Sequence, residues 1–371
     1  MKILLTCGGT GGHIYPAVAI ADKIKRRHPH ARILFVGTER GMEQSIVPVA
    51  GYDIESIPAS GFYRKNLLAN VGTLRNIAKG SAKARDIIAR FTPDRVIGTG
   101  GYVTGPVVRE AAKRGIPTYI HEQNAVPGMA NRILERYATK VLVSFPDSAN
   151  AFRHPEKVII TGNPVRKEFI SAVIGDHRGD LGYCSTDFVV LVVGGSLGAY
   201  ALNQEILRMV PRTSQAGIKL LFITGKRYYG EMKSALEGVL GKDSVRLIDY
   251  AENMPALIAA SDVVISRAGA LALAEIAVCG KASVLVPSPN VTNDHQYHNA
   301  QAFEKAGAAI IVRESELTEE TSVLADRLLR LKNNKQKLNS MSQAAFLIGR
   351  SDAADIIYEA LDLHLIRTDQ I

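Results

Sequence analysis

The sequence predicts an α/β protein of two Rossmann-like domains, each built on a parallel sheet, that face a shared cleft. Three observations support this fold class. The chain has 371 residues, too many for one ordinary core. Short apolar runs alternate with helical patterns along its whole length, as in parallel α/β sheets. A strand-like run followed by a glycine-rich loop occurs twice, at residues 3–12 and 189–198.

The expected strands are short runs of Val, Ile and Leu without alternation, typical of strands buried on both faces of a sheet. In the first half they span residues 2–7, 32–36, 95–98, 118–121, 140–143 and 157–160. In the second half they span residues 188–193, 219–224, 245–248, 263–265, 283–286 and 309–311. The last helix is expected at about residues 353–363.

The domain boundary is expected at Gly162-Asn163-Pro164, because Gly and Pro interrupt regular structure. We therefore predict a first domain over residues 1–163 and a second over residues 164–345. Residues 346–371 are expected to form a C-terminal helix that packs back on the first domain.

The positive charge of the chain is confined to its first half. Residues 1–165 hold 23 Lys and Arg against 12 Asp and Glu, whereas the remainder holds 22 against 24. Such asymmetry indicates a surface that meets an anionic partner. No nucleic-acid-binding motif occurs, which leaves a membrane or a phosphorylated ligand. Cys7, Cys184 and Cys279 have no metal or redox spacing, so we expect reduced thiols in a cytosolic protein.

Three glycine-rich loops, at residues 8–12, 98–101 and 194–198, are the strongest chemical signal. Such a turn between a strand and a helix lets backbone N–H groups approach an anion. None has the spacing of a dinucleotide-binding loop or a P-loop, so phosphate-bearing ligands of another kind are favoured. His13 follows the first loop at a helix N-terminus, which favours a neutral ring able to accept a proton. The alternative is a capping or packed histidine.

Further polar segments follow expected strands. Residues 121–124, His-Glu-Gln-Asn, end one strand and are either ligand-binding or a hydrogen-bonded loop. Residues 266–275 combine a small-residue loop with Glu275, whose carboxylate suits the two hydroxyls of a ribose. Residues 293–299 supply amides for sugar hydroxyls. No Asp-x-Asp pair, which could hold a divalent ion on a diphosphate, occurs in the chain, so we expect no metal. The negative charge of the leaving group would then be stabilised by helix N-termini and by a cation such as Arg166.

Seven short motifs follow one another along nearly the whole chain. They are Gly8-Gly9-Thr10-Gly11-Gly12-His13, Gly100-Gly101-Tyr102-Val103-Thr104-Gly105-Pro106, His121-Glu122-Gln123-Asn124, Gly162-Asn163-Pro164-Val165-Arg166, Gly194-Gly195-Ser196, Ser266-Arg267-Ala268-Gly269-Ala270 and His295-Gln296. This ordered set resembles the MurG family of glycosyltransferases. The resemblance implies the GT-B architecture, with an acceptor- and membrane-binding first domain and a second domain that binds the UDP-sugar.

The resemblance also implies a reaction and its partners. N-acetylglucosamine would pass, with inversion, from UDP-N-acetylglucosamine to the muramoyl 4-hydroxyl of the lipid I acceptor, undecaprenyl-diphospho-muramoyl-pentapeptide. The products would be lipid II and UDP, with no cofactor. His13 is the candidate general base, and Asn124 or Glu122 the supporting group.

The family's UDP-sugar contacts map onto this chain by motif. They fall on Thr10, Gly11, Gly12, Asn124, Arg166, Ser196, Ala251, Ala270, Leu271, Ala272, Leu273, Ala274, Glu275 and Gln296. Ala251 is implied to act through its backbone near the uracil, and Glu275 to hold the ribose. Leu197 stands where the family often carries Gln, so one contact to the donor sugar or phosphate is expected to be missing or replaced.

A lipid acceptor requires membrane docking, for which residues 64–85 are the candidate. Apolar residues at helical spacing are flanked by cations, a pattern that binds anionic interfaces without spanning them. The apolar residues are Leu67, Leu68, Val71, Leu74, Ile77 and Ala78, and the cations are Arg64, Lys65, Arg75, Lys79, Lys83 and Arg85. We expect a cytoplasmic protein bound peripherally to the inner face of the plasma membrane. An ordinary core-facing helix is the alternative.

Two other functions fit parts of the pattern. UDP-N-acetylglucosamine 2-epimerases share the two-domain fold and the donor, but need acidic groups at the sugar's C2 and no lipid surface. A non-catalytic UDP-sugar sensor is the third reading. The basic first half and the His13 loop favour transfer.

Overall fold

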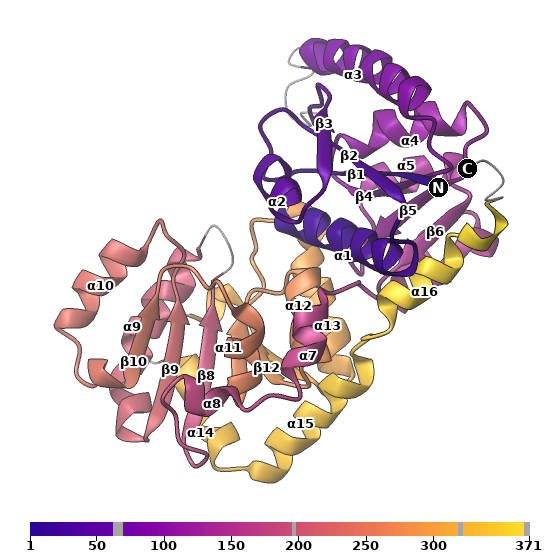
Figure 1. The fold of residues 1–371 in the computed structure, drawn as a ribbon. Helices are drawn as coiled ribbons and strands as arrows, with labels where there is room; N and C mark the ends of the chain where they lie inside the picture. Colours follow the sequence, from indigo (N-terminus) through magenta and orange to yellow (C-terminus); the bar gives the residue numbers. More distant parts are fainter. Residues whose placement is uncertain (62–69, 195–197, 318–321, 367–371) are drawn as a thin grey trace. The chain divides into compact units, whose positions relative to one another are not determined.

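The computed structural model describes residues 1–61, 70–194, 198–317 and 322–366 (Figure 1). The chain divides into two compact units, residues 1–166 with 351–371, and residues 167–350. The boundaries between the two units therefore lie after residues 166 and 350, not after residues 163 and 345 as expected from the sequence. The physical reasons are local: Arg166 packs on Tyr15 of the first unit, and helix α15 (Lys335–Ile348) continues past residue 345.

Unit 1 contains a seven-stranded parallel sheet in the order β3-β2-β1-β4-β5-β6-β7. Its strands are β1 (Lys2–Cys7), β2 (Arg32–Gly37), β3 (Asp53–Ser56), β4 (Arg95–Gly100), β5 (Thr118–Glu122), β6 (Lys140–Val143) and β7 (Val158–Ile160). Strand β3 was not predicted, because its sequence Asp-Ile-Glu-Ser lacks an apolar run. This strand lies at the sheet's edge, where a half-exposed, polar segment is tolerated.

Helices cover both faces of this sheet, and alternate residues of β1 show which helices cover which face. Leu5 belongs to a core cluster with α1 (Gly11–Arg27) and α16 (Ala353–Ala360), whereas Leu4 belongs to a cluster with α3 (Asn70–Phe91) and α4 (Thr104–Ala112). The remaining helices of the unit are α2 (Glu43–Val49), α5 (Met129–Leu134) and α6 (Pro146–Ala149).

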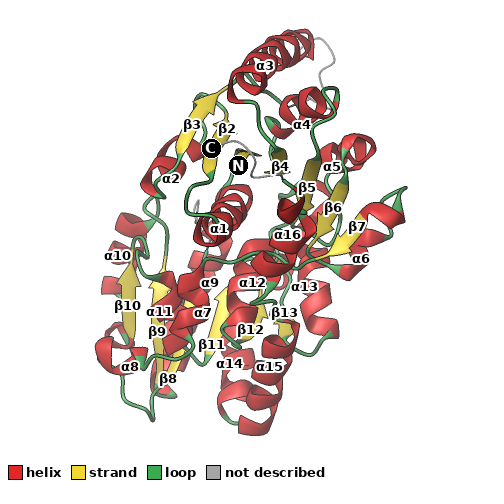
Figure 2. Ribbon diagram, turned by 45° about the vertical axis from the view of Figure 1, so that its right-hand side comes forward, coloured by secondary structure: helices red, strands yellow, loops and turns green. Residues whose placement is uncertain are grey.

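Helix α16 belongs to unit 1 although it lies near the end of the chain. Figure 2 shows it beside α1, and the Nε2 atom of His28 lies 2.7 Å from the hydroxyl of Tyr358. The helix ends at Ala360, earlier than expected, because Asp362 adopts a left-handed conformation with φ of 50°. Lys140 Nζ then donates to the Asp362 carboxylate at 2.6 Å.

Unit 2 repeats the topology with six parallel strands in the order β10-β9-β8-β11-β12-β13. These strands are β8 (Phe188–Val193), β9 (Ile218–Ile223), β10 (Val245–Ile248), β11 (Val263–Ser266), β12 (Ala282–Leu285) and β13 (Ala309–Ile311). Besides α15, its helices are α7 (Lys167–Ala172), α8 (His177–Asp180), α9 (Tyr200–Gln215), α10 (Tyr229–Glu237), α11 (Met254–Ala260), α12 (Ala270–Val278), α13 (His295–Lys305) and α14 (Val323–Lys332). The expected fold class of two parallel α/β domains is confirmed.

Both sheets change winding direction next to their first strand. In unit 1 the second and fourth strands flank β1, and in unit 2 their counterparts β9 and β11 flank β8. Ligands of open α/β sheets bind at such switch points, beyond the carboxyl ends of the strands. The first glycine loop follows β1, the second comprises the last three residues of β4 and Gly101, and the third follows β8 in the sequence. Among the described residues, no helix is long and apolar enough to cross a membrane.

Candidate active site

The loop between β1 and α1 presents the N-terminus of a helix at the switch point of unit 1. Thr10 is the N-cap residue in an extended conformation, and its carbonyl accepts the backbone N–H of His13 at 3.0 Å. Its hydroxyl makes no capping bond to the helix. Thr10 is exposed, whereas Gly11 and Gly12 are half-buried. A helix leaves its first N–H groups without intrahelical partners, which is the geometry that the predicted anion-binding role of this loop requires.

His13 is held in one orientation by its neighbours. Its Nδ1 atom lies 3.0 Å from the carbonyl oxygen of Gly8. A carbonyl can only accept a hydrogen bond, so Nδ1 carries the proton. In the neutral ring Nε2 then holds the lone pair, and among the described residues only Nδ1 has a hydrogen-bond partner. The side chain is half-buried and has the tautomer that a general base requires.

Glycines of the second loop make room for this histidine. A Cβ atom on Gly100 would lie 2.7 Å from Cδ2 and 2.9 Å from Nε2 of His13. Gly100 has φ of 121° and Gly101 has φ of 87°, conformations that side chains rarely adopt. The Gly8 N–H donates to the Gly100 carbonyl at 3.2 Å. The two glycine loops thus pack directly on each other at the switch point.

Glu43, which the sequence analysis did not single out, lies beneath the first loop. It begins α2 and is fully buried. Its carboxylate accepts the Gly9 N–H at 3.2 Å, the Thr38 N–H at 2.8 Å and the Thr38 hydroxyl at 2.6 Å. The carboxylate therefore fixes the backbone of the anion-binding loop. An acidic residue directly after the Gly41-Met42 turn was the only sequence signal.

The segment at the end of β5 contains a buried histidine with a structural role. Nε2 of His121 donates to the Gly162 carbonyl at 3.1 Å, and Nδ1 accepts from the Gln123 amide at 3.0 Å. Burial lowers its pKa to about 4; the bond to Gly162 opposes this shift and the nearby His13 adds to it. His121 is therefore neutral, and both of its ring nitrogens are hydrogen-bonded, whereas the described residues give a partner only to Nδ1 of His13.

Glu122 is also committed to holding its own loop. One carboxylate oxygen accepts from the backbone and side-chain amides of Asn124, at 3.0 and 3.2 Å. The other accepts from the Gly128 N–H at 3.0 Å and from the Asn131 amide at 2.8 Å. With four bonds and 2% exposure, Glu122 orients Asn124, which is half-buried, rather than taking a proton itself.

Arg166 lies against the first turn of α1. Its guanidinium carbon is 4.7 Å from the centre of the Tyr15 ring, which in turn packs against Gly11. The predicted cation and the first glycine loop are therefore brought together within unit 1. Arginine is suited to diphosphate because its planar fork can bind two oxygens at once.

In unit 2, α12 begins at the carboxyl end of β11, where β11 neighbours β8 at the switch point. Gly269 is its N-cap residue and makes no side-chain cap, so no capping side chain occupies the first N–H groups of the helix. Leu271, Ala272, Ala274 and Glu275 are half-buried, and Ala270 is buried. Leu273 is fully buried, so its side chain packs in the core and offers no surface to a ligand.

Two side chains tie the loops of this site together. Arg267 donates to the carbonyls of Val286 and Pro287, at 3.1 and 3.3 Å, and forms an ion pair with Glu314. The Gln296 carbonyl accepts the Ser288 N–H at 2.9 Å, which leaves its amide nitrogen as the group able to donate to a sugar hydroxyl. The motif around Arg267 does not predict this bridging role, because the role depends on the position of the loop after β12.

The backbone before α13 is strained. Asn293 and Asp294 both have positive φ, 56° and 48°, although neither is glycine. Such conformations cost about 1–3 kcal/mol each and concentrate at functional sites. Ala251 is half-buried in the segment after β10. Ser196 and Leu197, from the third glycine loop, lie outside the described residues.

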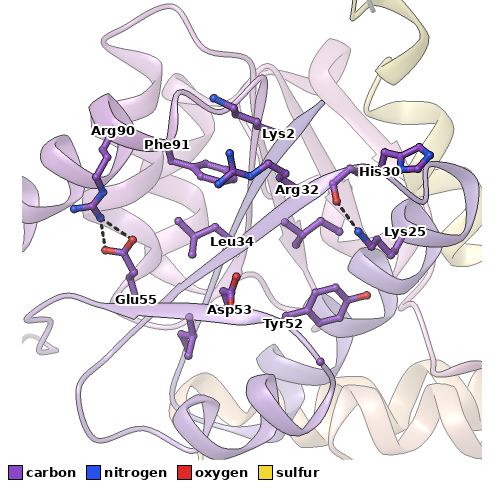
Figure 3. A pocket seen from close by; sticks show the side chains of 14 residues that line it. Lys2, Lys25, His30, Arg32, Leu34, Tyr52, Asp53, Glu55, Arg90 and Phe91 are labelled. Carbon is purple, nitrogen blue, oxygen red and sulfur yellow. Dashed lines mark hydrogen bonds and ion pairs between the residues drawn. The ribbon is translucent and has the colours of Figure 1, made fainter. Parts of the chain in front are cut away.

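The structure also contains a polar cavity of about 640 Å³ far from these loops (Figure 3). It lies at the amino ends of β1 and β2 and is lined by Lys2, Lys25 and Arg32, while Arg90 forms an ion pair with Glu55 at its side. Ligands of parallel sheets bind at the opposite, carboxyl edge. We therefore place the candidate site at the glycine loops. Among the described residues, no three His, Cys, Asp or Glu side chains form a metal-binding group.

Comparison with known proteins identifies the family. The glycosyltransferase family 28 N-terminal domain matches residues 3–143, and its C-terminal domain matches residues 189–357. A relative from Alkaliphilus oremlandii is 42% identical over 370 residues, covering 99% of this chain and all of the relative. Its name is UDP-N-acetylglucosamine--N-acetylmuramyl-(pentapeptide) pyrophosphoryl-undecaprenol N-acetylglucosamine transferase. A relative of the same name from Clostridioides difficile is 41% identical, covering 97% of this chain and 88% of the relative.

Solved structures agree with this assignment. The crystal structure of Acinetobacter baumannii MurG superimposes with a TM-score of 0.77 at 28% identity, over 97% of this chain and 99% of that one. A UDP-GlcNAc 2-epimerase from Neisseria meningitidis has a TM-score of 0.69 at 17% identity, over 97% and 99%, which shows the shared fold alone. With both domain types present and this identity over nearly its full length, the chain belongs to glycosyltransferase family 28.

Proposed function

We propose that this protein transfers N-acetylglucosamine from UDP-N-acetylglucosamine to the 4-hydroxyl of the muramoyl residue in undecaprenyl-diphospho-muramoyl-pentapeptide. The observation that carries the proposal is the 42% identity, over nearly the whole chain, to relatives named for this reaction. The epimerases share the fold at 13–17% identity, which carries no argument for their activity.

In this reaction His13 acts as the general base. The bond between the sugar's C1 and the UDP oxygen breaks while the acceptor oxygen bonds to C1 from the opposite face. The acceptor hydroxyl loses its proton to Nε2 of His13, whose lone pair follows from the hydrogen bond between Nδ1 and Gly8. Glu122 contributes indirectly, by orienting Asn124 toward the substrate.

The diphosphate groups are held without a metal or other cofactor. In unit 1, the N–H groups of the Thr10–Gly12 turn and the guanidinium of Arg166 stabilise negative charge at the first glycine loop. In unit 2, the N-terminus of α12 does the same for the departing UDP.

The donor's nucleoside and sugar bind in unit 2. The small side chains at positions 270, 272 and 274 let the nucleotide approach the helix backbone, and the Glu275 carboxylate takes the ribose hydroxyls. The Gln296 amide nitrogen donates to a hydroxyl of N-acetylglucosamine. Ala251 contacts the uracil through its backbone, and Ser196 contacts the donor from the third glycine loop.

The protein docks on the inner face of the plasma membrane through the basic surface of unit 1. In α3 the cations Arg75, Lys79, Lys83 and Arg85 are all exposed, which supports contact with anionic lipid. The predicted residues Arg64, Lys65, Leu67 and Leu68 lie outside the described residues, as do the side chains of Val71 and Leu74.

The reaction is tested by incubating the purified protein with UDP-N-acetylglucosamine and a lipid I analogue, followed by mass spectrometry of the products. A disaccharide-containing product and UDP in equal amounts are expected. Formation of UDP-N-acetylmannosamine without acceptor would assign an epimerase instead. Saturable UDP-N-acetylglucosamine binding without turnover would assign a sensor.

A further inference from the structure

The aromatic side chain of Tyr15 connects the first glycine loop to Arg166. Tyr15 lies in α1 four residues after Gly11, and the side chains of a helix lean toward its N-terminus. The ring therefore covers Gly11, where an added Cβ atom would lie 3.2 Å from Cε2 and 3.4 Å from Cδ2 of Tyr15. The guanidinium carbon of Arg166 lies 4.7 Å from the centre of the same ring. One side chain thus contacts both the anion-binding turn and the cation of this site.

The backbone that carries Arg166 is held by other contacts of unit 1. The Gly162 carbonyl accepts from Nε2 of His121 at 3.1 Å. Asn163 and Val165, which follow, are each 5% exposed. These contacts set the position of the Arg166 backbone, but an arginine side chain has several rotatable bonds of its own. The direction of the guanidinium therefore depends on the surface against which the side chain packs.

An aromatic ring can hold a guanidinium without cancelling its charge. The face of the ring attracts a cation through its quadrupole and carries no net charge. Arg267 of unit 2 shows a different arrangement, because it forms an ion pair with the Glu314 carboxylate. A ring face, unlike a carboxylate, brings no negative charge that would compete with a phosphate for the guanidinium. Tyr15 is therefore suited to orient a cation that must bind an oxyanion.

We propose that Tyr15 is a positioning residue that holds the Arg166 guanidinium toward the diphosphate of UDP-N-acetylglucosamine. The inference rests on the proposed function, in which Arg166 stabilises negative charge at the first glycine loop, and it commits that charge to the donor. A guanidinium that is oriented before the substrate arrives loses less side-chain freedom on binding, so the donor binds more tightly. Because the same ring packs on Gly11, it also sets the spacing between the cation and the helix N-terminus.

The test is a double-mutant cycle in the full-length protein, which separates this role from simple support of the loop. Tyr15→Leu removes the ring, Tyr15→Phe keeps it, Arg166→Ala removes the cation, and a fourth variant combines Tyr15→Leu with Arg166→Ala. The matched control is Tyr137→Leu, because Tyr137 is also half-buried in unit 1 and its ring centre lies 4.8 Å from the guanidinium carbon of Arg136. Initial rates at saturating acceptor give kcat/KM for UDP-N-acetylglucosamine, and titration calorimetry gives its Kd.

Tyr15→Leu should lower kcat/KM for UDP-N-acetylglucosamine about fivefold, the effect of a cation–π contact at a partly exposed site. Tyr15→Phe should restore kcat/KM to within about twofold of the unaltered protein, and Tyr137→Leu should match the unaltered protein. Arg166→Ala should lower kcat/KM at least about tenfold, because it removes a charged hydrogen-bond donor. The double variant should equal Arg166→Ala, since a ring that acts through the guanidinium has no effect once the guanidinium is gone.

Additive losses in the double variant would overturn the proposal and leave Tyr15 with a packing role beneath Gly11. An equal loss in Tyr15→Phe would overturn it by assigning the effect to the hydroxyl, and a change confined to the acceptor KM would separate Tyr15 from the donor. If Tyr15→Leu also unfolds more readily in urea, the comparison of the double variant with Arg166→Ala still decides. A disturbed loop lowers kcat/KM equally whether or not Arg166 is present.

Failure of the proposed reaction gives a different result. If the unaltered protein binds UDP-N-acetylglucosamine but forms no disaccharide, the proposed reaction is refuted, and the same cycle is measured on the Kd. A loss of affinity in Tyr15→Leu that disappears in the Arg166→Ala background would then still support the positioning role. Additive losses of affinity would overturn it.

Discussion

The ring of His13 packs against the α-carbon of Gly100, so closely that a Cβ atom there would lie 2.7 Å from Cδ2 of the ring. These residues come from different glycine loops, 87 positions apart, that meet at the switch point of unit 1. The contact fixes the position of Nε2, the atom to which the proposed mechanism assigns the proton.

Gly100→Ala should therefore displace the His13 ring and strain a backbone with φ of 121°. We expect kcat to fall by about 100-fold, because an aligned general base typically contributes about 10²- to 10⁴-fold to the rate. Steady-state kinetics with a soluble acceptor measure the change. Gly72→Ala is the control, since its Cβ would meet no atom within 4 Å; equal kcat values for the two variants would contradict the assigned role of His13.

Replacing Glu43 by Gln should loosen the first glycine loop. The amide keeps the shape but turns an NH₂ group toward N–H and O–H donors at Gly9 and Thr38. Leaving such donors unpaired costs about 1–3 kcal/mol, so we expect a lower free energy of unfolding in urea and a lower kcat/KM. The exposed Glu39→Gln in the preceding turn should change neither. A fully stable, fully active Glu43→Gln would refute the bracing role.

His121 should make the protein less stable in mild acid. Its pKa is about 4 in the fold but near 6.5 in the unfolded chain, so the unfolded state binds the extra proton. The free energy of unfolding is then highest above pH 6.5, and it decreases by about 3 kcal/mol in total as the pH falls from 6.5 toward 4.

Denaturant unfolding at several pH values tests this dependence. His121→Asn should be less stable at pH 7.5, because bonds to Gly162 and Gln123 are lost, yet should lose less additional stability on acidification. His30→Asn, at an exposed position, should show the same dependence of the unfolding free energy on pH as the unaltered protein. If the unfolding free energy of His121→Asn depended on pH as steeply as that of the unaltered protein, His121 would not be the source of the acid sensitivity.

Arg267→Lys should weaken donor binding. Lysine cannot reach the Val286 and Pro287 carbonyls and the Glu314 carboxylate together, as the arginine does. The loops before α12 and α13 then separate, and we expect KM for UDP-N-acetylglucosamine to rise about tenfold, with a smaller change in kcat. Initial rates at saturating acceptor give both constants. A rise confined to the acceptor KM would show that Arg267 does not support the donor site.

Much of the fold follows from local patterns in the sequence. Buried parallel strands need continuous apolar runs, which is why twelve of the thirteen strands in the described part of the chain were predicted, most within a residue or two of their observed ends. The polar β3 escaped because its edge position is set by pairing with β2, not by its own composition. The glycine loops were recognisable because only glycine combines close approach with positive φ, as at Gly100.

The sequence by itself determined the alternation of strands and helices, the two glycine-loop units and the residue types at the site. Only the tertiary structure decided the roles of two histidines that look alike in sequence. His13 keeps an available Nε2 because its other nitrogen binds Gly8, whereas His121 is buried between Gly162 and Gln123. The tertiary structure also places the Glu43 carboxylate beneath Gly9, which is 34 residues away in the sequence. Such contacts depend on which loops the sheet topology places together, and no local propensity encodes that proximity.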